Sequence, residues 1–194
     1  METSLTLLQS IKQQGDFESW ELLDSIYSPM IRRWLKRSHV RPADEADVLQ
    51  EVLLTVSRKI PSFERGVNRG SFRSWLKKIT VNCLRNYTRK RGNRGEAVGG
   101  SEMALLLQQL EDPDSLLSQA WNEEHQRCVF QHLMAIVRPG FKGETWKAFY
   151  DTAVSGKSAR EVADDIGMTV GAVHTAKSRV LSELRRIGQG LLED

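Results

Sequence analysis

The 194-residue chain has little of what marks a secreted or membrane-bound protein. It holds only two cysteines, Cys83 and Cys128, at helical positions that favour small buried side chains over a disulfide. It has no run of eighteen apolar residues, which excludes a membrane-spanning helix. Its N-terminus, METSLTLLQSIKQQGDF, is amphipathic and polar rather than a secretory signal, so the cytoplasm is the expected compartment.

Catalytic signatures are lacking as well. The sequence has no HExxH motif, no Gly-rich phosphate loop and no carboxylate pair in a basic setting, so no enzyme activity, cofactor or metal is expected. His125, Cys128 and His132 share one helix face, but the first and last are about 10 Å apart along the axis and a fourth ligand is missing. They are therefore interpreted as interior or interface residues.

Strand patterns are nearly absent, whereas 3.6-residue periodicity covers most of the chain. Separate helices are predicted over residues 17–27 and from Pro29 onward, and a further one over 43–59. The Gly-rich stretch GNRGEAVGGS (92–101) reads as the start of a linker. The expected fold class is all-α, with two small helical domains (1–92 and 119–194), a flexible linker (93–118), and a C-terminal helix-turn-helix.

Acidic residues are absent from 65–94, although ten of the 28 Lys and Arg lie there. Because the whole chain carries only +3, this local charge indicates a polyanionic partner. The aromatic residues among these charges (Phe72, Trp75 and Tyr87) suggest stacking on unpaired bases. A helix capped by Ser71 is predicted to direct one face outward, formed by Ser74, Lys77, Lys78, Val81, Arg85 and Thr88, with Asn82 on its flank. The alternative is an ordinary core helix with a solvated basic surface.

Residues 158–186, SAREVADDIGMTVGAVHTAKSRVLSELRR, have the pattern of a helix-turn-helix. Ser158 and Glu161 form a capping box, Gly167 permits a left-handed turn, and Thr169 can cap the second helix. The predicted outward face of that helix has small and polar residues near its start with Arg179 beyond them, which suits entry into a major groove. The stem of Lys177 is expected to pack while its ammonium reaches a phosphate.

Residues 44–54 combine acids with apolar residues on one predicted helix. Asp44, Asp47 and Glu51 share a stripe, and Leu49 and Leu53 form an apolar stripe beside it that is distinct from the Val48/Val52 core stripe. An exposed apolar stripe beside acids suggests a protein partner with basic residues. Acids near a helix start are also favoured by its dipole, so the two interpretations remain open.

Together these segments resemble the extracytoplasmic-function (ECF) sigma factors of the bacterial sigma-70 family, over about residues 17–91 and 119–187. ADEADVLQEVLLTV is similar to the family's DLxQEvF helix, and FRSWLKKITVNCLRNYTRKR to its FRxWLxxIAxNxxxDxxRRxR promoter-melting helix. The segment that begins at Ser158 is similar to SyeEIAeiLGisvGTVkSRlhRAr.

The resemblance implies a dissociable specificity subunit for transcription initiation. Its partners would be the clamp helices and flap of core RNA polymerase, promoter DNA both as duplex and as melted non-template strand, and, where one exists, an anti-sigma factor. The implied polymerase contacts are Asp44, Asp47, Leu49, Gln50, Glu51 and Leu53. The implied minus-ten contacts are Phe63, Asn68, Trp75, Lys77, Lys78, Asn82 and Arg85. The implied minus-thirty-five contacts are Thr169, Gly171, His174, Thr175, Lys177, Ser178 and Arg179.

The main alternative is a conventional helix-turn-helix regulator that binds a palindromic duplex as a dimer. Such a protein would need only the C-terminal motif. The basic, aromatic segment near the middle of the chain favours the sigma-factor interpretation, because it suits single-stranded DNA.

Overall fold

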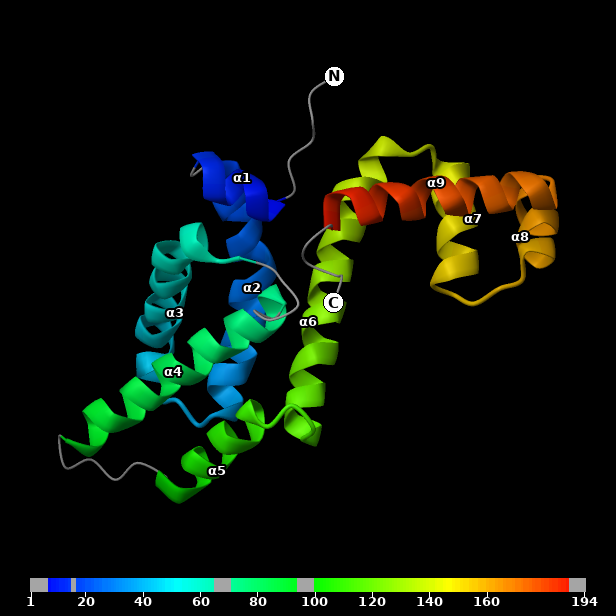
Figure 1. The fold of residues 1–194 in the computed structure, drawn as a ribbon. Helices are drawn as coiled ribbons and strands as arrows, with labels where there is room; N and C mark the ends of the chain where they lie inside the picture. Colours follow the sequence, from blue (N-terminus) through cyan, green and yellow to red (C-terminus); the bar gives the residue numbers. More distant parts are fainter. Residues whose placement is uncertain (1–6, 15–16, 65–70, 94–99, 189–194) are drawn as a thin grey trace.

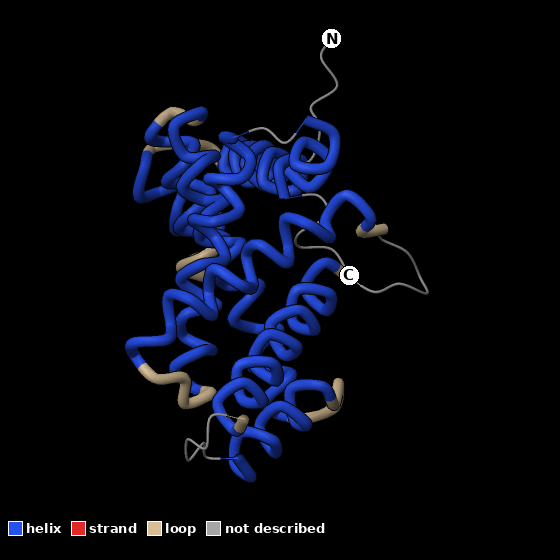
Figure 2. The backbone as a smooth tube through the Cα atoms, turned by 90° about the vertical axis from the view of Figure 1, so that its left-hand side faces the viewer, coloured by secondary structure: helices blue, strands red, loops and turns tan. Residues whose placement is uncertain are grey.

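A computed structural model describes residues 7–14, 17–64, 71–93 and 100–188. The described residues form helices and loops without a strand, which confirms the all-α prediction (Figure 2). The α-helices are α1 (Leu7–Gln14), α2 (Phe17–Arg37), α3 (Glu45–Lys59), α4 (Phe72–Gly92), α5 (Gly100–Glu111), α6 (Leu116–Val137), α7 (Gly143–Ala153), α8 (Ala159–Ile166) and α9 (Val170–Gly188). Short 3-10 turns follow α6 and flank α3 (Pro42–Asp44, Ile60–Ser62 and Arg138–Gly140).

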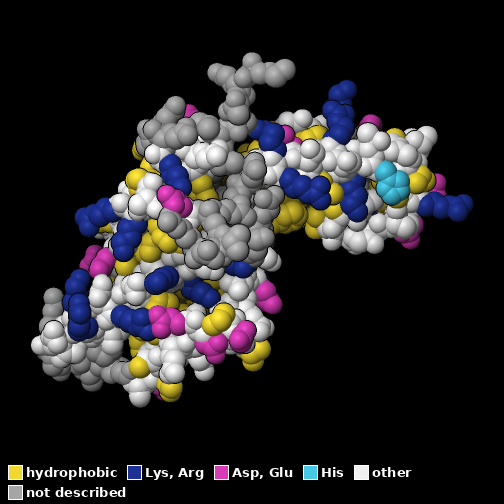
Figure 3. Space-filling view, viewed as in Figure 1, with side chains coloured by type: hydrophobic (Ala, Val, Ile, Leu, Met, Phe, Trp, Pro, Cys, Tyr) yellow, Lys and Arg dark blue, Asp and Glu magenta, His cyan; other side chains and the backbone are white. Residues whose placement is uncertain are grey.

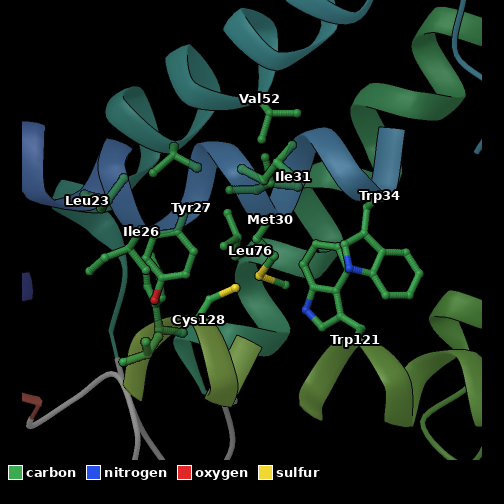
Figure 4. Packing of buried hydrophobic residues seen from close by; sticks show 14 of the residues in the cluster. Leu23, Ile26, Tyr27, Met30, Ile31, Trp34, Val52, Leu76, Trp121 and Cys128 are labelled. Carbon is green, nitrogen blue, oxygen red and sulfur yellow. The ribbon is translucent and has the colours of Figure 1, made fainter. Parts of the chain in front are cut away.

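Helix α2 is the centre of the N-terminal body. Its buried residues face Val52 of α3 on one side and the residues of α6 on the other, as Figure 4 shows. The sequence predicted a break before Pro29, but α2 continues through this proline. Proline removes one backbone hydrogen bond from a helix interior. The buried side chains of Ile26, Met30 and Trp34 extend across that position, and each contributes about 1.5–3 kcal/mol of burial that offsets the loss.

The segment predicted as a flexible linker contains a packed helix, so that part of the prediction is corrected. Helix α5 contacts both α4 and α6 (Figure 1). Its buried residues, Met103, Leu107 and Leu110, recur at helical spacing and form an apolar stripe. This stripe covers part of the α4 surface, and burial of the three side chains stabilises a helix that would be marginal alone.

Helix α6 connects the two helical bodies. Its N-terminal half packs on α2, where the Trp34 and Trp121 rings are 5.2 Å apart, and its C-terminal half packs on α9 (Figure 1). The larger of two clusters of buried hydrophobic residues includes Trp121, Val137 and Leu184, and the smaller one joins α7, α8 and the start of α9. The expected boundary at residue 119 therefore falls inside a helix that both bodies share.

The helix-turn-helix elements follow the local sequence signals. The capping box is present, since the Ser158 hydroxyl accepts from the Glu161 N–H and the Glu161 carboxylate accepts from the Ser158 N–H at 2.8 Å. Gly167 ends α8 at φ +68°, a conformation that glycine adopts without steric cost. The Ala172 N–H donates to the Thr169 hydroxyl at 3.2 Å, which caps α9. These local predictions are confirmed.

Candidate nucleic-acid interface

The outer surface of α4 carries most of the predicted minus-ten residues. Lys78, Asn82 and Arg85 are exposed, whereas Trp75 and Lys77 are half-buried. Figure 3 shows Lys and Arg side chains gathered where α4 lies. The Ser71 hydroxyl accepts from the Ser74 N–H, as expected for the N-cap of this helix. The structure thus presents a basic surface along α4 that can hold phosphates.

Helices α5 and α6 contact two of these basic side chains. The Arg85 guanidinium makes a bidentate ion pair with Glu111, and the bond from Nη1 to Oε1 measures 2.6 Å. The Lys77 ammonium donates to the Ser118 hydroxyl. Burial lowers the pKa of Lys77, and the nearby Arg73 charge lowers it further.

One residue of the predicted outward face is buried instead. Val81 is fully buried, and it lies in the hollow between α4 and α5 where Leu110 also packs. The helical wheel placed Val81 correctly on the face opposite Phe72, but it could not show that α5 covers this face.

The aromatic residues near α4 pack mainly on each other, and this corrects the stacking prediction for several of them. Phe63 is buried, with its ring 4.9 Å from that of Trp75 and 5.7 Å from that of Phe72. Phe72 and Tyr87 are buried too. Trp75 keeps partial exposure and is the aromatic residue of this cluster best placed to meet a base. Asn68 lies outside the described residues.

The acidic surface of α3 is partly neutralised from within the chain. Arg41 and the Tyr87 hydroxyl donate to the Asp44 carboxylate at 2.7 and 2.8 Å, and these bonds hold the pKa of Asp44 below its usual value. The Oε2 atom of Glu51 lies 3.4 Å from Nζ of Lys90. Asp47 and Gln50 remain exposed.

The predicted exposed apolar stripe on α3 is wrong for Leu49, which is 4% exposed and belongs to the core. Leu53 is half-exposed, and the neighbouring Leu54, which sequence reasoning missed, is 46% exposed. Both line a groove of about 390 Å³ between α2 and α3, with Trp20, Glu21, Leu23, Asp24, Gln50 and Ser57. The available signal was position, because Leu54 falls midway between Val52 and Val56 and therefore on the face of the helix opposite that buried stripe.

The predicted recognition helix α9 has the expected surface. Thr169, Gly171, His174, Thr175, Ser178 and Arg179 are exposed, and Lys177 is half-buried. The Thr175 hydroxyl donates to the Gly171 carbonyl at 2.9 Å, which keeps that side chain close to its own helix. The first two turns of α9 are therefore slim, and its long donors, Lys177 and Arg179, follow directly after them. This arrangement can enter a major groove.

The predicted interior placement of the histidine–cysteine group is confirmed for His125 and Cys128. Both are buried where α6 meets α2, and the Tyr27 hydroxyl lies 3.2 Å from His125 Nε2. Arg33 pairs with Glu124 and donates to Cys128 Sγ at 3.0 Å. Within the described ranges, no group of three His, Cys, Asp or Glu residues is arranged to hold a metal ion.

Of the helices that the structure describes, none has the length and apolar character needed to cross a membrane.

Comparison with known proteins gives one family model and several similar proteins. Residues 23–94 match the model of Sigma-70 region 2. The chain is 27% identical to the ECF RNA polymerase sigma-E factor of Haemophilus influenzae over 170 residues. The aligned region covers 84% of each chain. It is 26% identical to the sigma-E factor of Escherichia coli K12 over 84% of this chain and 83% of that protein. It is 23% identical to the ECF sigma factor SigE of Mycolicibacterium smegmatis over 94% of this chain and 66% of that protein. Over most of its length the chain is therefore similar to extracytoplasmic-function sigma factors, and its N-terminal body matches region 2 of the sigma-70 family.

Proposed function

We propose that the chain is an RNA polymerase sigma factor for transcription initiation, which binds core polymerase, recognises the minus-thirty-five and minus-ten promoter elements and promotes strand opening. The observation that carries this proposal is the presence of two different basic surfaces on two helical bodies joined by α6. The α4 surface suits single-stranded DNA, and the slim start of α9 suits a major groove. The chain would act as a specificity subunit, and the polymerase would catalyse RNA synthesis.

Docking on polymerase is assigned to the acidic–apolar surface of α3. Asp47, Gln50 and Leu53 keep their proposed roles, and the exposed Leu54 adds apolar area at the edge of the groove. Asp44 and Glu51 line a separate hollow toward α4, where their bonds to Arg41 and Lys90 reduce the charge offered to a partner. The groove fits an apolar residue from a partner whose surrounding surface is basic.

Promoter opening is assigned to the α4 surface. Lys78 and Lys77 would hold phosphates, whereas Asn82 and Arg85 would contact bases or sugars of the non-template strand, with Trp75 beside them. Phe63 would act indirectly, by fixing the Trp75 ring, because it is itself buried. The proposed functional units remain residues 1–92 for docking and melting and 119–194 for duplex recognition, with 93–118 between them.

The test is open-complex formation with core polymerase, followed by permanganate reactivity of unpaired thymines. The Lys78→Ala/Asn82→Ala variant should weaken promoter opening by about 1–3 kcal/mol, since contacts of this kind to unpaired bases have that size. A matched control, Lys36→Ala/Gln131→Ala, removes the same charge and amide from exposed positions on α2 and α6.

A promoter template that is already melted should partly rescue the Lys78→Ala/Asn82→Ala variant. Permanganate reactivity equal to that of the control, or failure of the melted template to rescue, would contradict the assignment to melting. Binding to a palindromic duplex as a dimer, without association with core polymerase, would favour the conventional regulator instead.

A further inference from the structure

Helix α5 lies on the same surface of α4 that carries the proposed minus-ten contacts. Leu110 of α5 and Val81 of α4 are both fully buried. They line a hollow of about 360 Å³ together with Ser74, Lys77, Lys78, Glu111 and Pro113. A DNA strand that followed the whole of this α4 surface would have to occupy space that α5 now fills.

The charged contacts of α5 imitate those of a phosphate. Glu111 accepts two parallel hydrogen bonds from the Arg85 guanidinium. Arg binds carboxylate and phosphate with the same bidentate geometry, so Glu111 occupies the donors that a strand would need. Arg85 and Glu111 are 26 positions apart in the sequence, which makes this a tertiary contact rather than a neighbour effect on one helix.

The start of α6 engages a second basic residue of the same surface. The Lys77 ammonium donates to the hydroxyl of Ser118, which is itself buried. Lys77 is thereby directed toward α6 rather than toward solvent. Two of the basic side chains proposed to hold the strand are thus engaged by the segment from α5 to the start of α6.

We propose that α5 is an internal competitor of single-stranded DNA, with Glu111 taking the place of a phosphate on Arg85. The proposal rests on the proposed function, because it concerns the regulation of the same α4 surface. In the free chain α5 covers the strand-binding surface, and a bound strand displaces it. Displacement is feasible because α5 has only twelve residues, and a helix of that length is marginal once its apolar stripe loses its partner.

The competition is expected to be modest and reversible. The Arg85–Glu111 pair is about half-exposed, with side-chain exposures of 47% and 42%. Exposed ion pairs of this kind are weak, so removing the competing carboxylate should strengthen DNA binding about two- to fivefold. Sensitivity to salt should rise with it, because salt weakens the internal ion pair of the wild-type protein and so offsets part of the loss of DNA affinity there.

The test measures binding of the full chain to a short fluorescent single-stranded DNA of mixed sequence at low salt. Glu111→Gln should bind about two- to fivefold more tightly than wild type. The control Glu102→Gln removes the same charge from an exposed position at the other end of α5, and it should show a smaller gain. Arg85→Ala should weaken binding, and adding Glu111→Gln to Arg85→Ala should give no further gain.

The outcomes separate the two proposals. Unchanged binding by Arg85→Ala would contradict the assignment of Arg85 to the strand, and the proposed competition with it. Weakened binding by Arg85→Ala together with unchanged binding by Glu111→Gln would overturn the competition alone. Hydrogen exchange gives a second measurement, because amide protons of residues 100–111 should exchange faster when the DNA is added. Unchanged protection of α5 at saturating DNA would also overturn the competition.

Discussion

At the scale of single residues, α3 shows how two leucines of the same helix, Leu49 and Leu54, acquire different roles. Leu49 is buried with Val48 and Val52, whereas Leu54 is exposed at the edge of the groove that Leu53 and Trp20 also line. A buried leucine contributes to the free energy of unfolding, and an exposed one is available to a partner. Substitution to alanine at the two positions should therefore affect different measurements.

Leu49→Ala should lower the free energy of unfolding by about 2–5 kcal/mol, because it leaves a cavity in the core. Leu54→Ala should change stability by less than about 0.5 kcal/mol but weaken binding to core RNA polymerase by about 1–3 kcal/mol. Chemical denaturation and a fluorescence binding assay with core enzyme distinguish these results. Leu105, an exposed leucine on a different helix (α5), provides the control: Leu105→Ala tests for a general loss of apolar surface. If Leu54→Ala binds polymerase as tightly as wild type, the groove is not the docking site.

At the scale of helices, the accuracy of sequence prediction depended on how local the determining interactions are. The capping box of α8, the turn at Gly167 and the cap at Thr169 depend on residues within a few positions of each other, and all three are confirmed. The continuation of α2 through Pro29 depends on packing against other helices, which no local pattern encodes.

Helix α5 shows how sequence prediction fails where a helix depends on contacts between distant residues. Its residues 102–111 include acids and follow a Gly-rich stretch, so the segment resembled a linker. Its apolar stripe is buried through packing on α4 and α6, and the ion pair of Glu111 with Arg85 joins distant positions. Helical periodicity assigned Leu49 and Val81 to faces correctly but could not show which faces other helices cover. This is why exposure was wrongly predicted at both positions.

The proposed recognition helix, α9, allows base and phosphate contacts to be distinguished at one residue. Arg179 is exposed at the middle of the helix, after its slim first two turns. If it contacts a base, Arg179→Ala should weaken duplex binding by about 1–3 kcal/mol and relax the sequence preference at one position. If it contacts a phosphate, binding should weaken evenly across sequences, and the slope of log affinity against log salt should fall by about one. Selection from a pool of promoter duplexes at two salt concentrations measures both effects, with Arg160→Ala on α8 as an exposed control. Wild-type affinity and preference in Arg179→Ala would mean that another face of α9 meets the DNA.

At the scale of the whole molecule, α6 couples the body that carries α4 to the body that carries α9. The Trp121 ring is fully buried beside Trp34, while Leu133 and Val137 continue the same hydrophobic cluster toward Leu184. A connected core of this kind should unfold as one unit, so damage at one end should be felt at the other.

Trp121→Ala tests this coupling. Removing the indole should cost about 3–5 kcal/mol, because the neighbouring side chains cannot fill the space around Trp34. If α6 makes the two bodies cooperative, amide exchange should become faster in α9 as well as in α2, although the ring that packs on Trp121 belongs to α2. Leu116→Ala, at an exposed position on the same helix, should leave exchange in both helices close to wild type. Faster exchange confined to α2 would show instead that the two bodies unfold independently, and α6 would then act as a connector rather than as a shared part of both cores.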